Sequence, residues 1–213
     1  QFFSIHGLLN EYLEDAREIR DGKIAHVKSL EECETLHFDG LGEFEAFITS
    51  GGTSTTPTTL LGKVKRLDYK TIRYPGHCDA LRLLRDLGLT DTKKIHIGEA
   101  YVSPREILSA VLDEKLPKQT PDIVLVRVTA TGISSCFSGG TKGGESGEEK
   151  IELVVKQDSA RGLSAMGQLT AFPAAAIALA ILKNTVPPGA HPQETVVPFA
   201  WMREQLGLFG IKL

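Results

Sequence analysis

Apolar and polar residues alternate with a period of two in several short segments of the first third of the chain. The clearest segments are Lys23–Val27, Thr35–Phe38 and Phe44–Thr49, and we predict a strand at each. Asp21-Gly22 precedes the first strand, and Asp-Gly favours a type I′ hairpin turn because both central residues need positive φ. Upstream of this turn, Glu11–Ile19 is helical by propensity, although a hairpin needs an extended partner there.

A loop and an extended segment lead to the first strongly predicted helix. Ser50–Thr59 consists of the glycines, hydroxyls and proline typical of turns and loops. Val64–Tyr74 has a β-branched, extended character that ends at Pro75, since proline disfavours helical backbone in the residue before it. The leucines of His77–Leu87 share one face at helical spacing, and Gly88 follows as a natural helix end.

Helix and strand signals continue in the second half. Ser103–Leu116 is predicted to be a helix because serine, proline and glutamate at its first, second and fourth positions form a capping box. Asp122–Thr131 and Lys150–Gln157 are predicted strands, rich in Val, Ile and Leu. The intervening SGGTKGGESGEE is interpreted as a hairpin tip, because a phosphate-binding loop would continue into a helix rather than into acids and a strand.

The C-terminal part is the most apolar. Ser164–Lys183 is predicted to be the most buried helix, with Pro173 either kinking it or marking its start. After the break at Pro187-Pro188-Gly189, Glu194–Leu208 is predicted as a last amphipathic helix. The pattern predicts an α+β fold with a mostly antiparallel or mixed sheet and helices packed on one face. We expect one domain over 1–213, strand-rich at 1–74, helical at 75–120, with a hairpin at 121–160 and helices at 161–213.

Composition narrows the classes of function. The 213 residues are 41% hydrophobic, enough to bury a core. The net charge is −3, and Lys and Arg alternate with acids, which argues against a nucleic-acid partner. No apolar run reaches the roughly 18 residues of a spanning helix, so no membrane partner is expected.

The cysteines and histidines predict neither a disulfide framework nor a metal site. Cys33, Cys78 and Cys136 are odd in number and form no CxxC, so a reducing cytoplasm is the expected location. Cys136 is interpreted as a small buried residue rather than a nucleophile, because no partnered base is evident. The histidines are scattered, and no metal is expected.

Residues able to bind a carboxylate concentrate in Tyr69–His77, at a predicted strand-to-helix junction. Arg73 offers a planar fork for bidentate binding, and Gly76 lets a ligand approach the backbone. The following helix start would offer unpaired N–H groups. The alternative is that Arg73 pairs with a surface acid and His77 caps the helix, and the residues alone leave both open.

The chain resembles the second domain of the saccharopine dehydrogenase family, which includes saccharopine reductases and lysine 6-dehydrogenases. The resemblance is carried by FEAFITSGG and YKTIRYPGHCDALRLLRDLGL, which contains a T-[IL]-R-Y-x-G motif followed by a helix. Two later segments, LSAMGQLTAFPAAAIALAIL and PQETVVPFAWMREQLGLFGI, resemble the family's closing pattern. The resemblance extends from Gly7 to Ile211.

This resemblance implies a two-domain enzyme in which an N-terminal Rossmann domain holds NAD or NADP. The sequence contains no GxGxxG between a strand and a helix, so we expect the cofactor to be bound outside it. The chain would then be the substrate-binding and dimerisation part of an oxidoreductase acting on the C–N bond of an amino acid, forming a homodimer and inactive by itself. The alternative is a non-catalytic amino-acid-binding or oligomerisation module.

The resemblance also suggests individual roles. Arg73 would bind a substrate carboxylate, and His77 is the candidate general base because its pKa suits proton transfer near neutral pH. Saccharopine reductases carry an arginine where this chain has Ser50-Gly51-Gly52-Thr53, so saccharopine and a lysine-like substrate both remain open. In the family the tail returns to the cofactor domain, and an exposed apolar patch is expected there. The candidate substrate contacts are Arg73, Thr71, Tyr74, Gly76, Ser50 and Gly51.

Overall fold

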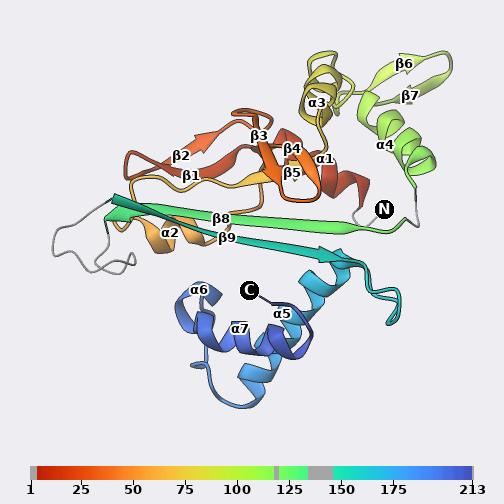
Figure 1. Cartoon of the computed structure of the whole chain (residues 1–213). Coiled ribbons are helices and arrows are strands. Elements are labelled where there is room, and N and C mark those ends of the chain that lie inside the picture. Colours follow the sequence, from red (N-terminus) through yellow and green to blue (C-terminus); the bar gives the residue numbers. More distant parts are fainter. Residues whose placement is uncertain (1–3, 118–119, 134–145, 213) are drawn as a thin grey trace. The chain divides into compact units, whose positions relative to one another are not determined.

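The computed structural model (Figure 1) describes residues 4–117, 120–133 and 146–212 of the chain. The chain divides into two compact units, Gln1–Gln119 and Thr120–Leu213. All strand pairings in the described ranges are antiparallel, which confirms the predicted α+β class, with several small sheets in place of one larger sheet. Cys136 and most of the predicted hairpin tip lie outside the described residues.

The first unit begins with helix α1 (Ile5–Leu13) and a hairpin of β1 (Ala16–Arg20) and β2 (Lys23–Val27). Asp21 and Gly22 both have positive φ, 50° and 74°, which confirms the predicted turn. The helix favoured by propensity over Glu11–Ile19 is found only as far as Leu13, and the residues from Ala16 form a strand instead. Backbone pairing decides this, because β1 hydrogen-bonds to β2 on one edge and Ile19 bridges Leu67 on the other.

A three-stranded sheet forms the middle of the first unit. Its order is β3 (Glu34–Phe38), β4 (Gly42–Ile48) and β5 (Lys70–Arg73), with β4 in the centre. Strands β3 and β4 confirm two of the predicted strands, and β5 confirms the predicted Val64–Tyr74 segment over Lys70–Arg73. The predicted loop before β5 is wrong in part, because it contains the short helix α2 (Thr56–Leu60), which Pro57 can begin since its missing N–H is not needed there.

Two helices and a small hairpin complete this unit. Helix α3 (His77–Asp86) ends before Gly88, as predicted, and the φ of 75° at Gly88 is one that glycine adopts at little cost. Helix α4 (Pro104–Lys115) begins with the predicted capping box. Sequence analysis missed the hairpin of β6 (Ile95–Ile97) and β7 (Ala100–Val102), whose three-residue strands are too short to establish a period.

The core of the first unit joins α1, β4 and α3. Tyr12, Leu30, Phe47 and Cys78 are buried against one another, and Leu8 and Leu81 pack on them from the sides. This packing brings together segments that are far apart in the sequence, including the start of α3 and the C-terminal end of α1.

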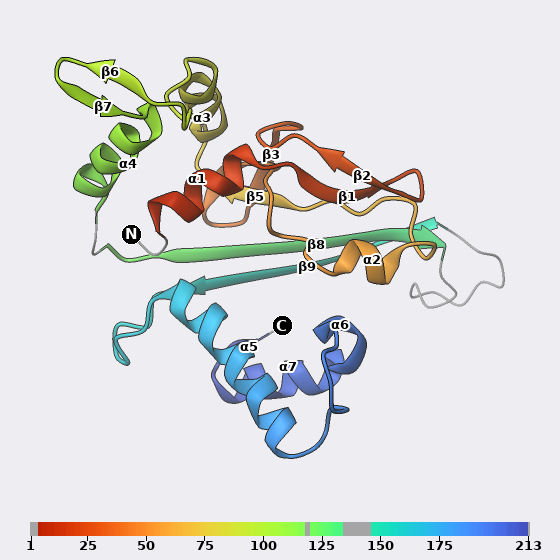
Figure 2. The ribbon, with the colours of Figure 1, turned by 180° about the vertical axis from the view of Figure 1, so that it is seen from behind.

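The second unit contains a long two-stranded ribbon and three helices, seen from both sides in Figures 1 and 2. Strands β8 (Ile123–Ile133) and β9 (Ser146–Lys156) pair in register. Helices α5 (Ala165–Leu182), α6 (Gln193–Val196) and α7 (Phe199–Leu208) follow. The single helix predicted over the last two is interrupted after Val196, because Pro198 removes a backbone donor. The core residues are Val155, Ala165, Leu206 and Ile211.

Helix α5 corrects two predictions. It is not the most buried helix: 22% of its residues are buried, and Ile181 and Leu182 are 59% and 77% exposed. Its 18 residues include no charged side chain, so by length and composition alone this helix could cross a membrane. The sequence argument overlooked it because Gly, Gln, Thr and Pro interrupt the apolar run without adding charge. Pro173 lies inside the helix.

Candidate functional site

The hydroxyl group of Tyr12 joins two of the predicted site residues. It lies 3.0 Å from Nε of Arg73 and 3.0 Å from Nε2 of His77. These three side chains come from α1, β5 and the first residue of α3. Tyr12 itself is 1% exposed and was not singled out from the sequence, where its only signal is the apolar spacing of Ile5, Leu9 and Tyr12 along α1.

Donor chemistry fixes the direction of one of these two hydrogen bonds. A guanidinium group can only donate, so Nε of Arg73 donates to the Tyr12 oxygen. The Tyr12 hydroxyl has a hydrogen to donate and a further lone pair, so the tautomer of His77 decides whether Nε2 accepts from it or donates to it. Burial lowers the pKa of His77, and the positive charge of Arg73 lowers it further, so the imidazole is neutral at pH 7.

Aromatic packing holds the same imidazole in place. The His77 ring stacks on Phe47 with centroids 6.1 Å apart and an interplanar angle of 15°. The Tyr12 ring packs against both of these rings, with its centroid 5.5 Å from that of His77 and 6.0 Å from that of Phe47. Burial raises the pKa of Tyr12 against the opposing influence of Arg73, so its hydroxyl stays protonated at neutral pH.

The amino end of α3 is occupied by a carboxylate of the chain itself. Glu45 Oε2 accepts from the N–H of Gly76 at 2.9 Å, and its Oε1 accepts from the N–H of Cys78 at 2.5 Å. Glu45 reaches this position because β4 and β5 pair it with Arg73. The prediction that these N–H groups are open to a ligand is therefore wrong, and Gly76 serves as the left-handed residue before the helix, with φ of 88°.

Arg73 keeps part of its donor capacity. Its Nη1 donates to the carbonyl oxygen of Ile72 at 3.0 Å, in addition to the bond from Nε to Tyr12. Within the described part of the chain, Nη2 makes no hydrogen bond. Glu11 lies close enough to interact with this charge, but burial is the larger effect and raises the pKa of Glu11. A half-buried cation with spare donors can bind an anionic group of a ligand.

Two predicted substrate contacts are satisfied inside the unit. The hydroxyls of Thr71 and Thr49 are 2.6 Å apart and buried between β4 and β5. Ser50 is also buried, and its hydroxyl donates to the carbonyl oxygen of Asn10 at 3.4 Å. Both hydroxyls therefore hold strands and helix together in this structure.

The remaining two predicted contacts lie at the surface. Tyr74 is 67% exposed and packs its ring on Phe44, with centroids 5.4 Å apart. Gly51 is exposed in a turn with φ of 87°. The structure thus gathers Arg73, Gly76 and His77 around Tyr12 and Glu45, and places the other candidates elsewhere in the unit.

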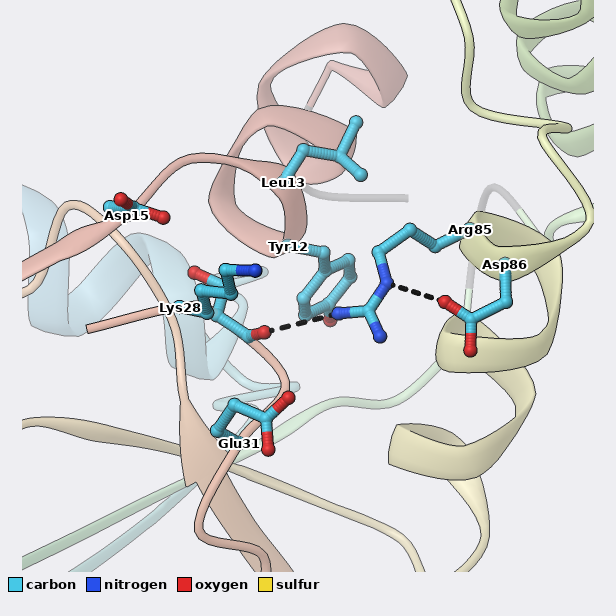
Figure 3. A pocket seen from close by; sticks show the side chains of 8 residues that line it. Tyr12, Leu13, Asp15, Lys28, Glu31, Arg85 and Asp86 are labelled. Atoms are coloured by element: carbon cyan, nitrogen blue, oxygen red, sulfur yellow. Dashed lines mark hydrogen bonds and ion pairs between the residues drawn. The ribbon is translucent and has the colours of Figure 1, made fainter.

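Tyr12 also lines a cavity of about 400 Å³ (Figure 3). Arg85 crosses it, donating to Asp86 Oδ1 at 2.9 Å and to the carbonyl oxygen of Ser29 at 3.4 Å. Both signs of charge are present on its walls, which suits a small molecule that carries both charges. The lining residues are Tyr12, Leu13, Asp15, Lys28, Ser29, Glu31, Arg85 and Asp86.

The described residues contain neither a three-ligand metal cluster nor a Rossmann topology. No group of three His, Cys, Asp or Glu side chains among them could hold a metal ion. A Rossmann dinucleotide site needs parallel strands joined by a helix, whereas every pairing in the described ranges is antiparallel.

Comparison with known proteins identifies the family of this chain. The family described as Saccharopine dehydrogenase C-terminal domain matches residues 2–207. The solved structure of apo, histidine-tagged saccharopine dehydrogenase (L-Glu forming) from Saccharomyces cerevisiae has the same fold, with a TM-score of 0.71 at 16% identity. That match covers 99% of this chain and 60% of the yeast chain. The match over nearly the whole sequence shows that the chain belongs to the saccharopine dehydrogenase family and corresponds to its C-terminal domain.

Proposed function

We propose that this chain is the substrate-binding and dimerisation part of an NAD(P)-dependent oxidoreductase acting on the C–N bond of an amino acid related to saccharopine or lysine. The observation that carries the proposal is the cluster of Tyr12, Arg73 and His77. It combines a partly buried cation and a neutral imidazole on the segment that bears the family motif. The homodimer rests on the family resemblance.

Arg73 is proposed to bind a substrate carboxylate through Nη2 and the second hydrogen of Nη1. The hydrogen bonds from Nε and Nη1 to Tyr12 and Ile72 hold the guanidinium plane in one orientation before the substrate arrives. Such preorganisation lowers the entropic cost of binding. Partial burial strengthens the interaction relative to an exposed arginine, because less water screens it.

His77 is proposed to take up a proton during the reaction. Because the Tyr12 hydroxyl occupies Nε2, a proton arriving there would be relayed through that hydroxyl, which would receive one proton as it donates another. The lowered pKa of His77 leaves the imidazole neutral at pH 7 and able to accept a proton. The positive charge of Arg73 makes the His77 imidazole a weaker base. A substrate carboxylate bound to Arg73 would offset this charge and raise the basicity of His77.

The nicotinamide cofactor is proposed to be bound by a part of the protein outside this sequence. This follows the family resemblance and the misfit between the antiparallel strands described here and a Rossmann site. Exposed apolar residues of α5 and α7, such as Leu182, Phe199 and Leu208, are the proposed contacts with that part.

A non-catalytic amino-acid-binding module is the alternative. In such a module Thr71, Ser50 and Glu45 would serve the fold, through the internal hydrogen bonds that they make here. Dinucleotide binding by the full-length protein separates the two functions, because the oxidoreductase must bind NAD or NADP and the module need not.

The proposed contact between Arg73 and a substrate carboxylate is tested by the kinetics of Arg73→Ala in the full-length protein, with lysine and saccharopine as substrates. Loss of a charged hydrogen bond of about 1.5–3 kcal/mol predicts a KM increase of roughly 10- to 150-fold. Arg17→Ala is the matched control, because Arg17 lies in the separate β1–β2 sheet and donates to the exposed Thr58 hydroxyl. An unchanged KM for Arg73→Ala would show that the guanidinium does not bind substrate.

A further inference from the structure

The cavity that Tyr12 lines has charged side chains without partners on its walls. Lys28, Asp15 and Glu31 line it, and none of these side chains forms a hydrogen bond or an ion pair with another residue that the structure describes. All three are solvent-exposed, so water alone solvates them when the cavity is empty. The volume of about 400 Å³ lies within the range of roughly 300–1,000 Å³ that is usual for small-molecule sites.

Arg85 adds an oriented donor to the same cavity. Its Nε donates to Asp86 Oδ1 and its Nη1 to the carbonyl oxygen of Ser29, whereas Nη2 makes no hydrogen bond within the described ranges. The two bonds hold the guanidinium plane, and Figure 3 shows Arg85 and Lys28 reaching into the cavity from opposite sides. A carboxylate between them would accept from Nη2 of Arg85 and from the ammonium group of Lys28.

The segment after β2 forms one wall of the cavity and is held in place by its backbone. The N–H of Leu30 donates to the carbonyl oxygen of Ile48 at 2.8 Å, and the N–H of Ile48 donates to that of Glu31 at 3.0 Å. The hydroxyl of Ser29, which is buried, donates to the carbonyl oxygen of Glu14. A wall that is already ordered lowers the entropic cost of binding a ligand.

The balance of charge on the walls selects the class of ligand. Arg85 and Asp86 form an ion pair and neutralise each other. One cation, Lys28, and two anions, Asp15 and Glu31, then remain without partners. The complementary ligand carries one carboxylate and two ammonium groups, which is the composition of an α-amino acid with an ammonium group on its side chain.

We propose that this cavity is a second ligand site, which binds a small basic α-amino acid. The ligand carboxylate lies between Lys28 and Arg85, and its two ammonium groups face Glu31 and Asp15. The site goes beyond the proposed function, because its charged residues are separate from those proposed to act on the substrate.

Tyr12 connects this site with the cluster of Arg73 and His77. Its ring lines the cavity, while its hydroxyl hydrogen-bonds to both of those residues. Helix α3 makes a second connection, since it carries His77 as its first residue and Arg85 in its last turn. A ligand bound between α1 and α3 therefore favours the arrangement of these helices in which the cluster forms, which gives the ligand the role of an effector.

The experiment is isothermal titration calorimetry of the full-length protein with L-lysine and with L-norleucine, which lacks the side-chain ammonium group. Lysine should bind roughly tenfold more tightly, because only lysine satisfies both carboxylates of the site. Lys28→Glu should weaken lysine binding by at least about tenfold, since it places a like charge beside the ligand carboxylate. Lys23→Ala, exposed on β2 outside the cavity, is the matched control and should leave the affinity unchanged. Bound lysine should also slow hydrogen exchange in α3.

Arg73→Ala separates this site from the proposed substrate contact. Lysine binding that persists in Arg73→Ala and is lost when Lys28→Glu is added supports the cavity site. If Arg73→Ala alone abolished all lysine binding, the cavity proposal would be overturned and the proposed function supported. Absence of any lysine binding, or equal affinity for norleucine, would also overturn it. In an otherwise unchanged protein, Lys28→Glu should reduce the number of lysine molecules bound per chain by one, so the test does not depend on the folding of Arg73→Ala.

Discussion

Tyr12 and His77 share one hydrogen bond of 3.0 Å, and the same Tyr12 oxygen accepts from Nε of Arg73 at 3.0 Å. The bond ties the C-terminal end of α1 to the amino end of α3, where burial and the charge of Arg73 keep the imidazole of His77 neutral at pH 7. The same hydroxyl thus has a structural consequence and a chemical one, and removing it should affect both.

Tyr12→Phe keeps the ring in the core but removes the shared hydroxyl. We expect the free energy of unfolding to fall by about 1–3 kcal/mol, because Arg73 Nε and His77 Nε2 lose a partner in a buried setting. Urea denaturation measures the change, with the exposed Tyr101→Phe as control. Equal stability of the two variants would mean that water replaces the hydroxyl at no cost.

Stability should fall as the pH drops from about 7 to 5, through the protonation of His77. The unfolded imidazole binds a proton near its ordinary pKa of 6.5, whereas the folded one resists it to lower pH. Below pH 6.5 the unfolded state therefore binds more protons than the folded state. Lowering the pH favours the unfolded state until it reaches the pKa of His77 in the folded protein. Burial raises the pKa values of Glu11 and Glu18, so above pH 4.5 the folded state binds more protons at these carboxyl groups than the unfolded state does. Their protonation therefore increases the stability as the pH falls, opposite to the effect of His77.

A variant isolates the histidine contribution from that of the carboxyl groups. His77→Gln retains an acceptor for Tyr12 without titrating, so its stability should depend less on pH over this range than that of the wild type. Chemical denaturation at closely spaced pH values measures the slope of each. Parallel slopes would assign the acid sensitivity to other groups.

Glu45→Ala should destabilise the first unit by about 1–3 kcal/mol. The change removes the carboxylate that accepts from the N–H groups of Gly76 and Cys78, and helix N-termini lose stability when such acceptors are deleted. Glu43→Ala, exposed on the same strand, is the matched control. Hydrogen exchange at the first turn of α3 should increase in the first variant and stay unchanged in the second.

Asp122→Ala should loosen the start of α5 in the second unit. Its two carboxylate oxygens accept from the N–H groups of Ala165 and Met166, at 2.7 and 2.8 Å. We expect a loss of about 1–2 kcal/mol, the usual scale for a helix cap. Asp113→Ala on α4 serves as control, and protection of the Ala165 and Met166 amides against exchange is the direct readout. Unaltered protection would show that Ser164, the N-cap of α5, suffices by itself.

Local chemistry explains why much of the fold was predictable. The Asp21-Gly22 turn and the Ser103 capping box are set by backbone sterics and by side chains three residues apart, so neighbours in sequence determine them. Proline has an equally local effect at two other places, where the prediction was wrong. Pro57 begins a short helix inside a predicted loop, and Pro198 divides a helix that was predicted to be continuous. The exposure of α5 could not be read from its composition, since an apolar helix is equally compatible with a core and with a surface that another chain segment covers.

The sequence by itself determined the family and the α+β class and singled out Arg73 and His77 as candidates, because the hydrophobic pattern and the TIRYPGH motif are local features of the chain. Tertiary structure alone decided that Tyr12 lies between them and that Glu45 fills the amino end of α3. Each of these contacts depends on the register of β4 with β5 and on the packing of α1 against α3. Hydrogen-bond partners at such sequence separations are chosen by the fold and leave no period or spacing in the chain.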